Sequence, residues 1–519
     1  MVTIYLWDGV GCIGGNKILI EDTTKERSLL LDFGKNFGEE NKFFDEFLKP
    51  RDRFGVYDLL RMGLLPPFVH LYRKDLIPPD FDFSMEVPKI KPVGGLLITH
   101  AHLDHIGYIP YLSEDLPMVA STVSAALMKS LQDTNRQLYS ELVAVAGKET
   151  TENGVIKSSS TASLRARPFL LMQSPQDRDA FTEHVWSTCF TKKSYMASAP
   201  WYGSDTCSVA EFNVRSWPVD HSIPGAMAYA VETSAGWVVY TGDLRLHGTK
   251  GALTRAFFKE AAALNPVALI TEGTHPEEIN PVTEQQVEER SLNTVKNNAG
   301  LTIADFGARN VERLLSFLRI AKETNKYLVL TPKDFLLLEY LNYATEDVPH
   351  PLDEPCVLVY ISPKSRNDGW ETHVISLLSP EKMVNSKQIH ARPEDYILCF
   401  SYYDFANLLD IDVHNGCYIY SSSEPFNEEM ALDHEKIKNW INLFGFEIYG
   451  RLGQVAEAFD NRDPFHASGH IDANGLKEMI ETIKPKYLIP IHTEKPQFFE
   501  QFKGMVTLIN PKRYDPIVL

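Results

Sequence analysis

The sequence of 519 residues is poor in cysteine and has no long apolar run. Its six cysteines are scattered without a Cys-x-x-Cys pair, so the sequence indicates neither a disulfide framework nor a thiolate metal site. No apolar segment approaches the roughly 20 residues that a membrane-spanning helix needs. The N-terminal residues also show neither the basic stretch nor the apolar core of a secretory signal. These absences predict a cytoplasmic protein that does not associate with a membrane.

Positive charge is scarce as well. Lysine and arginine total 51 residues against 69 aspartates and glutamates, which gives a formal net charge of −18. This balance argues against a broad basic surface for duplex nucleic acid, so a polyanionic partner would have to enter a local channel. The length exceeds what one ordinary core supports and predicts two to three domains.

The most informative segment is 99–105, Thr-His-Ala-His-Leu-Asp-His, which directly follows the apolar run 95–98. It places His100, His102, Asp104 and His105 within six residues. Imidazole and carboxylate together suit zinc, manganese or iron, and this set exceeds what one tetrahedral ion usually takes from one loop. The segment therefore predicts two metal ions, with a loop of surface histidines as the alternative.

Six apolar, strand-like runs each lead into a polar residue that can bind a metal or a phosphate. These residues are Asp32, His100, His221, Asp243, Glu272 and His492. Because strands of one sheet that carry functional residues at their ends build a single site along that edge, we expect these side chains to converge. His221 would pass for an ordinary loop histidine in isolation, but its position after a strand end favours a ligand.

A hydrolytic site with two metals needs about six or seven ligands that leave room for a bridging water. The predicted ligands are His100, His102, Asp104, His105, His221, Asp243 and His492, with Asp243 shared between the two ions. Asp32 is better placed behind the ligands, where it would accept hydrogen bonds from the His100 loop; a turn residue is the alternative.

The segment 466–470, His-Ala-Ser-Gly-His, predicts a phosphate-binding turn. Two imidazoles and the Ser468 hydroxyl flank Gly469, which permits close approach of the backbone to an anion. The alternative is a helix-entry turn in which His466 and His470 are incidental.

The chain between Glu272 and His466 changes to alternating strands and helices. Strands are expected at 301–304, 327–330, 356–360, 396–400 and 417–420, and helices at about 310–322 and 428–444. This pattern predicts a parallel-sheet domain at 281–460 inserted into a metal-binding domain, of which 1–280 form the first part and 461–519 the return. The return begins with a helix that carries Leu476, Met479, Ile480 and Ile483 on one face. Residues from about 130 to 210 are interpreted as a polar surface elaboration.

Together, Asp32, the segment 100–105, His221 and Asp243 resemble the metallo-β-lactamase superfamily. The segment 241–248, Thr-Gly-Asp-Leu-Arg-Leu-His-Gly, resembles its β-CASP nuclease branch. Glu272, His470 and His492 match the acidic motif, the catalytic histidine and the last metal ligand of that branch, and the segments 421–428 and 485–487 look most like the ribonuclease J family. The implied fold class is α/β, a metallo-β-lactamase αββα sandwich with an inserted β-CASP parallel α/β domain.

This resemblance also implies a catalytic assignment. Asp243 and two divalent transition-metal ions, Zn²⁺ first and Mn²⁺ as the alternative, would act on a phosphodiester, while His470, oriented by Glu272, protonates the leaving oxygen. His466, Ser468 and Ser422 are assigned to phosphate binding.

The predicted function is hydrolysis of single-stranded RNA, exonucleolytic or endonucleolytic, since relatives that act on DNA usually carry an apolar residue at the position of His492. The alternatives are a β-CASP DNA nuclease and a non-catalytic scaffold of an RNA-processing complex. A small-molecule hydrolase is disfavoured by the inserted domain and the phosphate-suited turn. A homo-oligomer stays open as an option.

Overall fold

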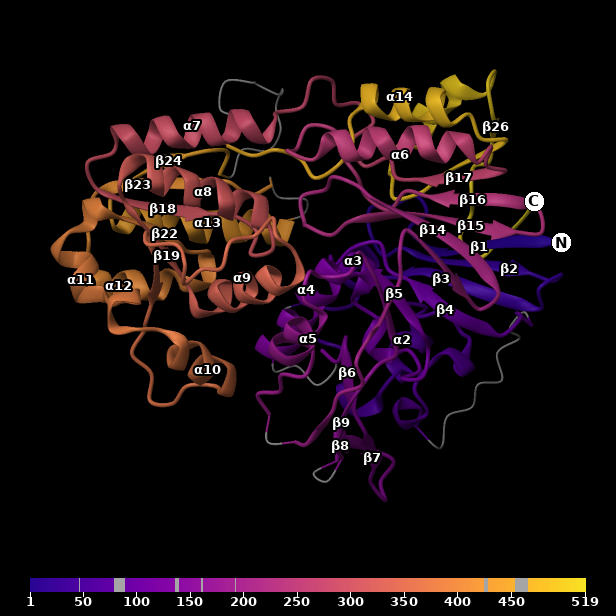
Figure 1. Cartoon of the computed structure of the whole chain (residues 1–519), viewed down its shortest axis with the longest axis horizontal. Helices are drawn as coiled ribbons and strands as arrows, with labels where there is room; N and C mark the ends of the chain where they lie inside the picture. Colours follow the sequence, from indigo (N-terminus) through magenta and orange to yellow (C-terminus); the bar gives the residue numbers. More distant parts are fainter. Residues whose placement is uncertain are drawn as a thin grey trace.

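The computed structural model of the chain describes residues 1–45, 47–78, 89–135, 140–159, 162–191, 193–423, 428–452 and 465–519. These residues build two large sheets that face each other and a third that stands beside them (Figure 1). The predicted boundary between residues 460 and 461 lies outside the described residues. Among the described residues, no helix combines the length and the apolar character needed to cross a bilayer.

The first sheet has eight strands in the order β12-β10-β5-β4-β3-β2-β1-β27. Their bounds are β1 Val2–Asp8, β2 Lys17–Asp22, β3 Arg27–Phe33, β4 Val93–Leu97, β5 Met118–Ser121, β10 Phe169–Met172, β12 Trp201–Tyr202 and β27 Pro516–Val518. Successive side chains of a strand point to opposite faces of the sheet, and both faces of this sheet are buried. Leu29 and Leu31 pack against the second sheet, whereas Leu30 packs outward with the helix α4 (Thr122–Thr134).

The second sheet has seven strands in the order β13-β14-β15-β16-β17-β25-β26. Their bounds are β13 Thr206–Val209, β14 Phe212–Pro218, β15 Met227–Thr233, β16 Gly236–Tyr240, β17 Ala268–Thr271, β25 Tyr487–Pro490 and β26 Thr507–Leu508. Its outer face is covered by α6 (Gly251–Ala263) and α14 (Ala473–Ile483). The four apolar residues predicted to share one face of α14 are all buried there, as spacings of three and four residues require.

The third sheet is parallel and has the order β21-β20-β19-β22-β18-β23-β24. Its strands are β18 Leu301–Asp305, β19 Tyr327–Leu330, β20 Val357–Tyr360, β21 Met383–Val384, β22 Tyr396–Cys399, β23 Gly416–Tyr420 and β24 Phe446–Tyr449, and its longer helices are α7 Glu284–Asn297, α8 Val311–Thr324, α9 Pro332–Ala344 and α13 Glu428–Leu443. Layers of helix, sheet, sheet and helix beside a parallel α/β unit confirm the predicted fold class.

Two expectations need correction. The strand ends predicted to share one sheet belong to two: β3 and β4 lie in the first sheet, and β14, β16, β17 and β25 lie in the second. The side chains still converge because the carboxyl ends of both sets lie at the same end of the sandwich.

The interpretation of residues 130–210 as a surface elaboration is also wrong for much of the segment. β10 and β12 extend the first sheet beyond β5, and Phe169 and Trp186 are buried in its core. The same segment holds the third sheet in place: the Thr188 hydroxyl lies 2.8 Å from the Tyr340 hydroxyl of α9, which donates to Asp133. Strands of two to four residues carry too little periodicity to be recognised from the sequence.

Candidate metal centre

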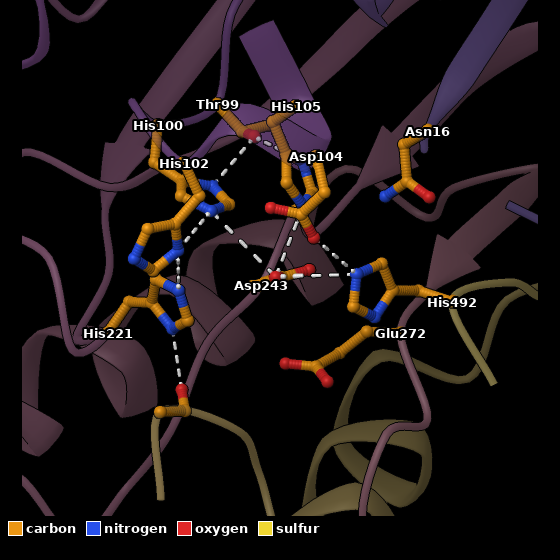
Figure 2. Close-up of polar contacts among 12 residues, drawn as sticks. Asn16, Thr99, His100, His102, Asp104, His105, His221, Asp243, Glu272 and His492 are labelled. Carbon is orange, nitrogen blue, oxygen red and sulfur yellow. Dashed lines mark hydrogen bonds and ion pairs between the residues drawn. The ribbon is translucent and has the colours of Figure 1, made fainter. Parts of the chain in front are cut away.

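All seven predicted ligands lie close to one another (Figure 2). They form two groups, His100, His102 and His221 in one, and Asp104, His105, Asp243 and His492 in the other. Within each group the candidate donor atoms lie within 4.8 Å of one another. The structure therefore brings together side chains from four separate segments of the chain.

The first group consists of three imidazoles whose nitrogens face one another. Nδ1 of His102 lies 3.1 Å from Nε2 of His100 and 3.1 Å from Nε2 of His221. Burial lowers the pKa of His100 and of His102 well below the ordinary value, and lowers the pKa of His221 to about 3. His221 is oriented by its Nδ1, which lies 2.6 Å from the carbonyl oxygen of Gly469. Neutral imidazoles that aim their nitrogens at one point are suited to a metal ion.

Asp243 lies between the two groups. Its Oδ2 is 3.1 Å from Nε2 of His105, 3.7 Å from Nε2 of His492 and 3.8 Å from Nε2 of His100. Burial alone would raise the pKa of Asp243, but His105 and His492 outweigh burial and hold it well below the ordinary value. Its Oδ1 is buried and has no hydrogen-bond partner in the described part of the chain. A buried carboxylate oxygen without a donor fits a metal ligand, because such a group is otherwise costly to bury.

Asp32 lies behind the histidines and fixes the ligand loop. Its carboxylate accepts hydrogen bonds from the Thr99 backbone at 2.8 Å and from the Thr99 hydroxyl at 2.7 Å. Nδ1 of His105 lies 2.7 Å from Oδ2, and the Tyr240 hydroxyl donates to the same oxygen at 2.8 Å. These contacts orient the histidine ring from behind, as outer partners of metal ligands do.

The loop that carries Asp243 can approach the ligand loop only because residue 242 is glycine. Gly242 has a φ of +56°, and a Cβ there would lie 2.7 Å from the Thr99 Cβ. Any side chain at this position would push the Asp243 loop away from His100.

His470 and Glu272 form a hydrogen-bonded pair beside Asp243. Nδ1 of His470 lies 2.9 Å from Oε2 of Glu272, whose other oxygen accepts from the Leu244 backbone at 2.8 Å. Burial lowers the pKa of His470, but the carboxylates of Glu272, Asp243 and Asp104 outweigh burial and raise it to about 9. The imidazole is therefore held in its protonated form, close to the ligands but on the side of the return segment.

The predicted phosphate-binding residues are Ser468, His466 and Ser422, of which the first two differ in their hydrogen-bond partners. The Ser468 hydroxyl accepts a hydrogen bond from the His470 backbone at 3.1 Å, and His466 Nδ1 lies 3.4 Å from the carbonyl oxygen of Ser421. Burial lowers the pKa of His466 to about 4, so its imidazole is neutral. Ser422 is half-buried at the end of β23, and residues 424–427 of the segment 421–428 lie outside the described residues.

A buried ion network that the sequence did not reveal holds this turn. Arg245 is fully buried and donates to Asp220 at 3.2 Å, to Glu284 at 2.9 Å and to Glu312 at 2.7 Å. It also donates to the carbonyl oxygen of Ser468 at 3.0 Å. One guanidinium thus ties the second sheet to α7, to α8 and to the turn that carries His470.

We expect Arg245→Ala to lower the free energy of unfolding by about 3–5 kcal/mol, because removal of one partner leaves buried carboxylates without a counter-charge. Denaturant unfolding measures this change. Arg255→Ala is the matched control, since Arg255 forms an exposed ion pair with Glu478 that is worth less than about 1 kcal/mol. Equal effects of the two substitutions would contradict the structural role of the network.

Further residues near the centre were not predicted from the sequence. The Thr274 hydroxyl donates to Glu272 at 2.7 Å and lies 2.9 Å from Nδ1 of His492. His275 lies with its ring 5.7 Å from that of His470, and Arg309 reaches the ligand loop from the third sheet. Thr274 and His275 directly follow the Glu272 motif, which was the available signal. Arg309 had none, because its partner is remote in the sequence.

Comparison with known proteins gives an independent indication of the fold. Residues 462–501 match the family model of the Zn-dependent metallo-hydrolase RNA specificity domain. The chain is 21% identical to ribonuclease J of Helicobacter pylori (strain B128), over 94% of this chain and 55% of that protein. It is 23% identical to ribonuclease J of Mycoplasma genitalium, over 98% of this chain and 69% of that protein. The chain thus spans little more than half the length of the Helicobacter relative.

A crystal structure of a protein of unknown function from Enterococcus faecalis V583 superposes with a TM-score of 0.68 at 22% sequence identity, and the match covers 100% of both chains. This likeness shows the fold. The sequence matches bear out the resemblance predicted from the sequence, to the metallo-β-lactamase superfamily and most of all to ribonuclease J.

Proposed function

We propose that this chain is a metal-dependent ribonuclease that hydrolyses phosphodiester bonds of single-stranded RNA. The observation that carries the proposal is the buried Asp243 carboxylate, which belongs to one group of metal-ligating side chains and faces the other, and whose Oδ1 has no hydrogen-bond partner among the described residues. A protonated His470 that Glu272 orients stands beside it. In this assignment, residues 1–280 and 461–519 form the catalytic domain and 281–460 the inserted domain.

The ligands are assigned to two divalent ions, with His100, His102 and His221 on one, Asp104, His105 and His492 on the other, and Asp243 on both. Such ions, when bound, supply a strongly polarised water and stabilise negative charge on the phosphodiester. His470 supplies the proton: Glu272 holds its Nδ1–H, which leaves Nε2–H to protonate the leaving oxygen. Asp32 keeps His105 oriented throughout.

Three observations favour RNA over DNA. The description of the family model that matches residues 462–501 names RNA specificity, and the full-length relatives are named ribonuclease J. His492 supplies an imidazole where DNA-directed relatives usually have an apolar residue. The test is a cleavage assay on 5′-monophosphorylated, 5′-triphosphorylated and circular RNAs beside DNAs of the same sequences. Cleavage of the circle identifies endonucleolytic activity, and equal or faster cleavage of DNA would overturn the choice of RNA.

A blunt RNA duplex is expected to be cut more slowly than the matching single strand, on the order of tenfold or more. The ligands lie where loops of the third sheet meet the two facing sheets, and the Arg309 side chain contacts the backbone of the ligand loop. Because His100, His105, Asp243 and His492 are buried, a duplex would have to open before one of its strands reached them, and the net charge of −18 offers it no broad attraction. Single-turnover rates on both substrates measure the difference. If the blunt duplex is cut as fast, the third sheet does not restrict access.

A further inference from the structure

Arg309 is the contact between the third sheet and the metal-ligand loop. It lies on the loop between β18 and α8, and its Nη1 donates to the carbonyl oxygen of Ala101 at 2.9 Å. Ala101 is the residue between His100 and His102. A side chain from a distant part of the sequence therefore lies directly over the backbone of two predicted metal ligands.

Arg309 forms no close ion pair among the described residues, although the Asp104 carboxylate is near enough to raise its pKa against the larger, lowering effect of burial. Arg245 and Arg313, which are fully buried, each form an ion pair with Glu284, at 2.9 and 2.7 Å. The bond of Arg309 to Ala101 uses only one of several N–H groups. The side chain is half-buried, so its remaining N–H groups can be reached by a ligand that enters from solvent. The fold keeps this charge where an anionic ligand would satisfy it.

The guanidinium also lies close to the centre, because the residue that it contacts stands between His100 and His102. The loop is rigid on one side, because the Asn310 side chain caps α8 by accepting from the Arg313 backbone at 3.0 Å. It borders open space on the other, because a Cβ built on Gly307 would meet no atom within 4 Å. The loop is thus open to solvent two residues before Arg309, and the guanidinium is held at the ligand loop by its bond to Ala101.

We propose that Arg309 binds a phosphate oxygen of the RNA strand at the metal centre, and that it is the group through which the third sheet takes part in cleavage. This inference rests on the proposed nuclease function. The planar N–H groups of the Arg309 guanidinium suit a phosphate, which they can bind with two parallel hydrogen bonds. The proposal explains why the cation comes from the third sheet: a strand that enters between the third sheet and the ligand loop meets the metal ligands on one side and Arg309 on the other.

The test compares Arg309→Ala and Arg309→Lys with Arg319→Ala, a control on α8 whose side chain is about half exposed and pairs with Glu288. We expect Arg309→Ala to keep its metal content and to lower kcat by about 10²-fold, the scale for loss of one fixed donor to developing charge. Arg309→Lys should recover part of the rate, and guanidinium added to the Arg309→Ala enzyme should restore part of it. Arg319→Ala should match the wild type.

Binding provides a second readout that does not depend on turnover. In a His470→Ala background, Arg309→Ala should weaken binding of a short oligouridylate and reduce the salt slope by about 0.7 for the lost phosphate contact. Metal loss in Arg309→Ala would overturn the proposal, because Arg309 would then only hold the Ala101 backbone. If the wild type cleaves RNA and Arg309→Ala changes neither the rate nor the salt slope, the proposed phosphate contact is wrong. The proposed nuclease function would then still stand. If the wild type cleaves no RNA, the proposed function fails, and unchanged oligouridylate binding then refutes this inference as well.

Discussion

Asp243→Asn is expected to lower the occupancy of both metal ions and to reduce cleavage by about 10²–10³-fold or more. The wild type should hold close to two transition-metal ions per chain. Both ions should respond because the Asp243 carboxylate lies between the two ligand groups, 3.1 Å from His105 and 3.8 Å from His100. An amide keeps the shape of the side chain but loses the charge and one of the two acceptor oxygens. Elemental analysis of purified protein gives the metal content, and a single-strand RNA assay gives the rate.

Asp410→Asn is the matched control for this experiment, because Asp410 is an exposed carboxylate on α12 (Leu408–Ile411). It should change neither the metal content nor the rate. A stable content of one ion in metal-replete wild-type protein would contradict the two-metal assignment. Loss of only one ion from Asp243→Asn would contradict the shared role of the carboxylate.

His470→Ala should reduce the rate by about 10²-fold or more, the usual scale for loss of a general acid, while metal content and RNA affinity stay at the wild-type level. The rate should fall without loss of metal because His470 Nδ1 lies 2.9 Å from Oε2 of Glu272 and 3.8 Å from Oδ2 of Asp243. Its removal takes away a proton donor and leaves the seven predicted ligands untouched. Single-turnover cleavage, elemental analysis and equilibrium binding of a short RNA measure the three quantities.

His390→Ala serves as the control, since His390 is an exposed histidine beside the third sheet whose Nδ1 lies 3.0 Å from the backbone carbonyl oxygens of Ile411 and Asp412. Metal loss in His470→Ala would make His470 a ligand, an option that its place in a group with Asp243, Glu272 and His492 leaves physically open. An unchanged rate would remove it from the chemistry altogether.

The sequence by itself determined the local parts of the molecule. The segment 99–105 follows an apolar run, and β4 does end at Leu97, just before the ligand loop. The face of α14 that Leu476 and Ile480 share is buried as its period requires. These features depend on residues a few positions apart, and side-chain period and strand ends are properties of the local backbone.

The tertiary structure alone decided how these parts meet. It placed the predicted strand ends in two sheets instead of one. It also placed β10 and β12 in the first sheet, although the sequence had indicated a polar surface segment there. It also brought Arg309 to Ala101 and Arg245 to Ser468, across separations of 208 and 223 residues. Such pairings leave no mark on the sequence nearby, because hydrogen bonds and ion pairs between distant segments form only when the packing of the sheets has fixed where each segment lies.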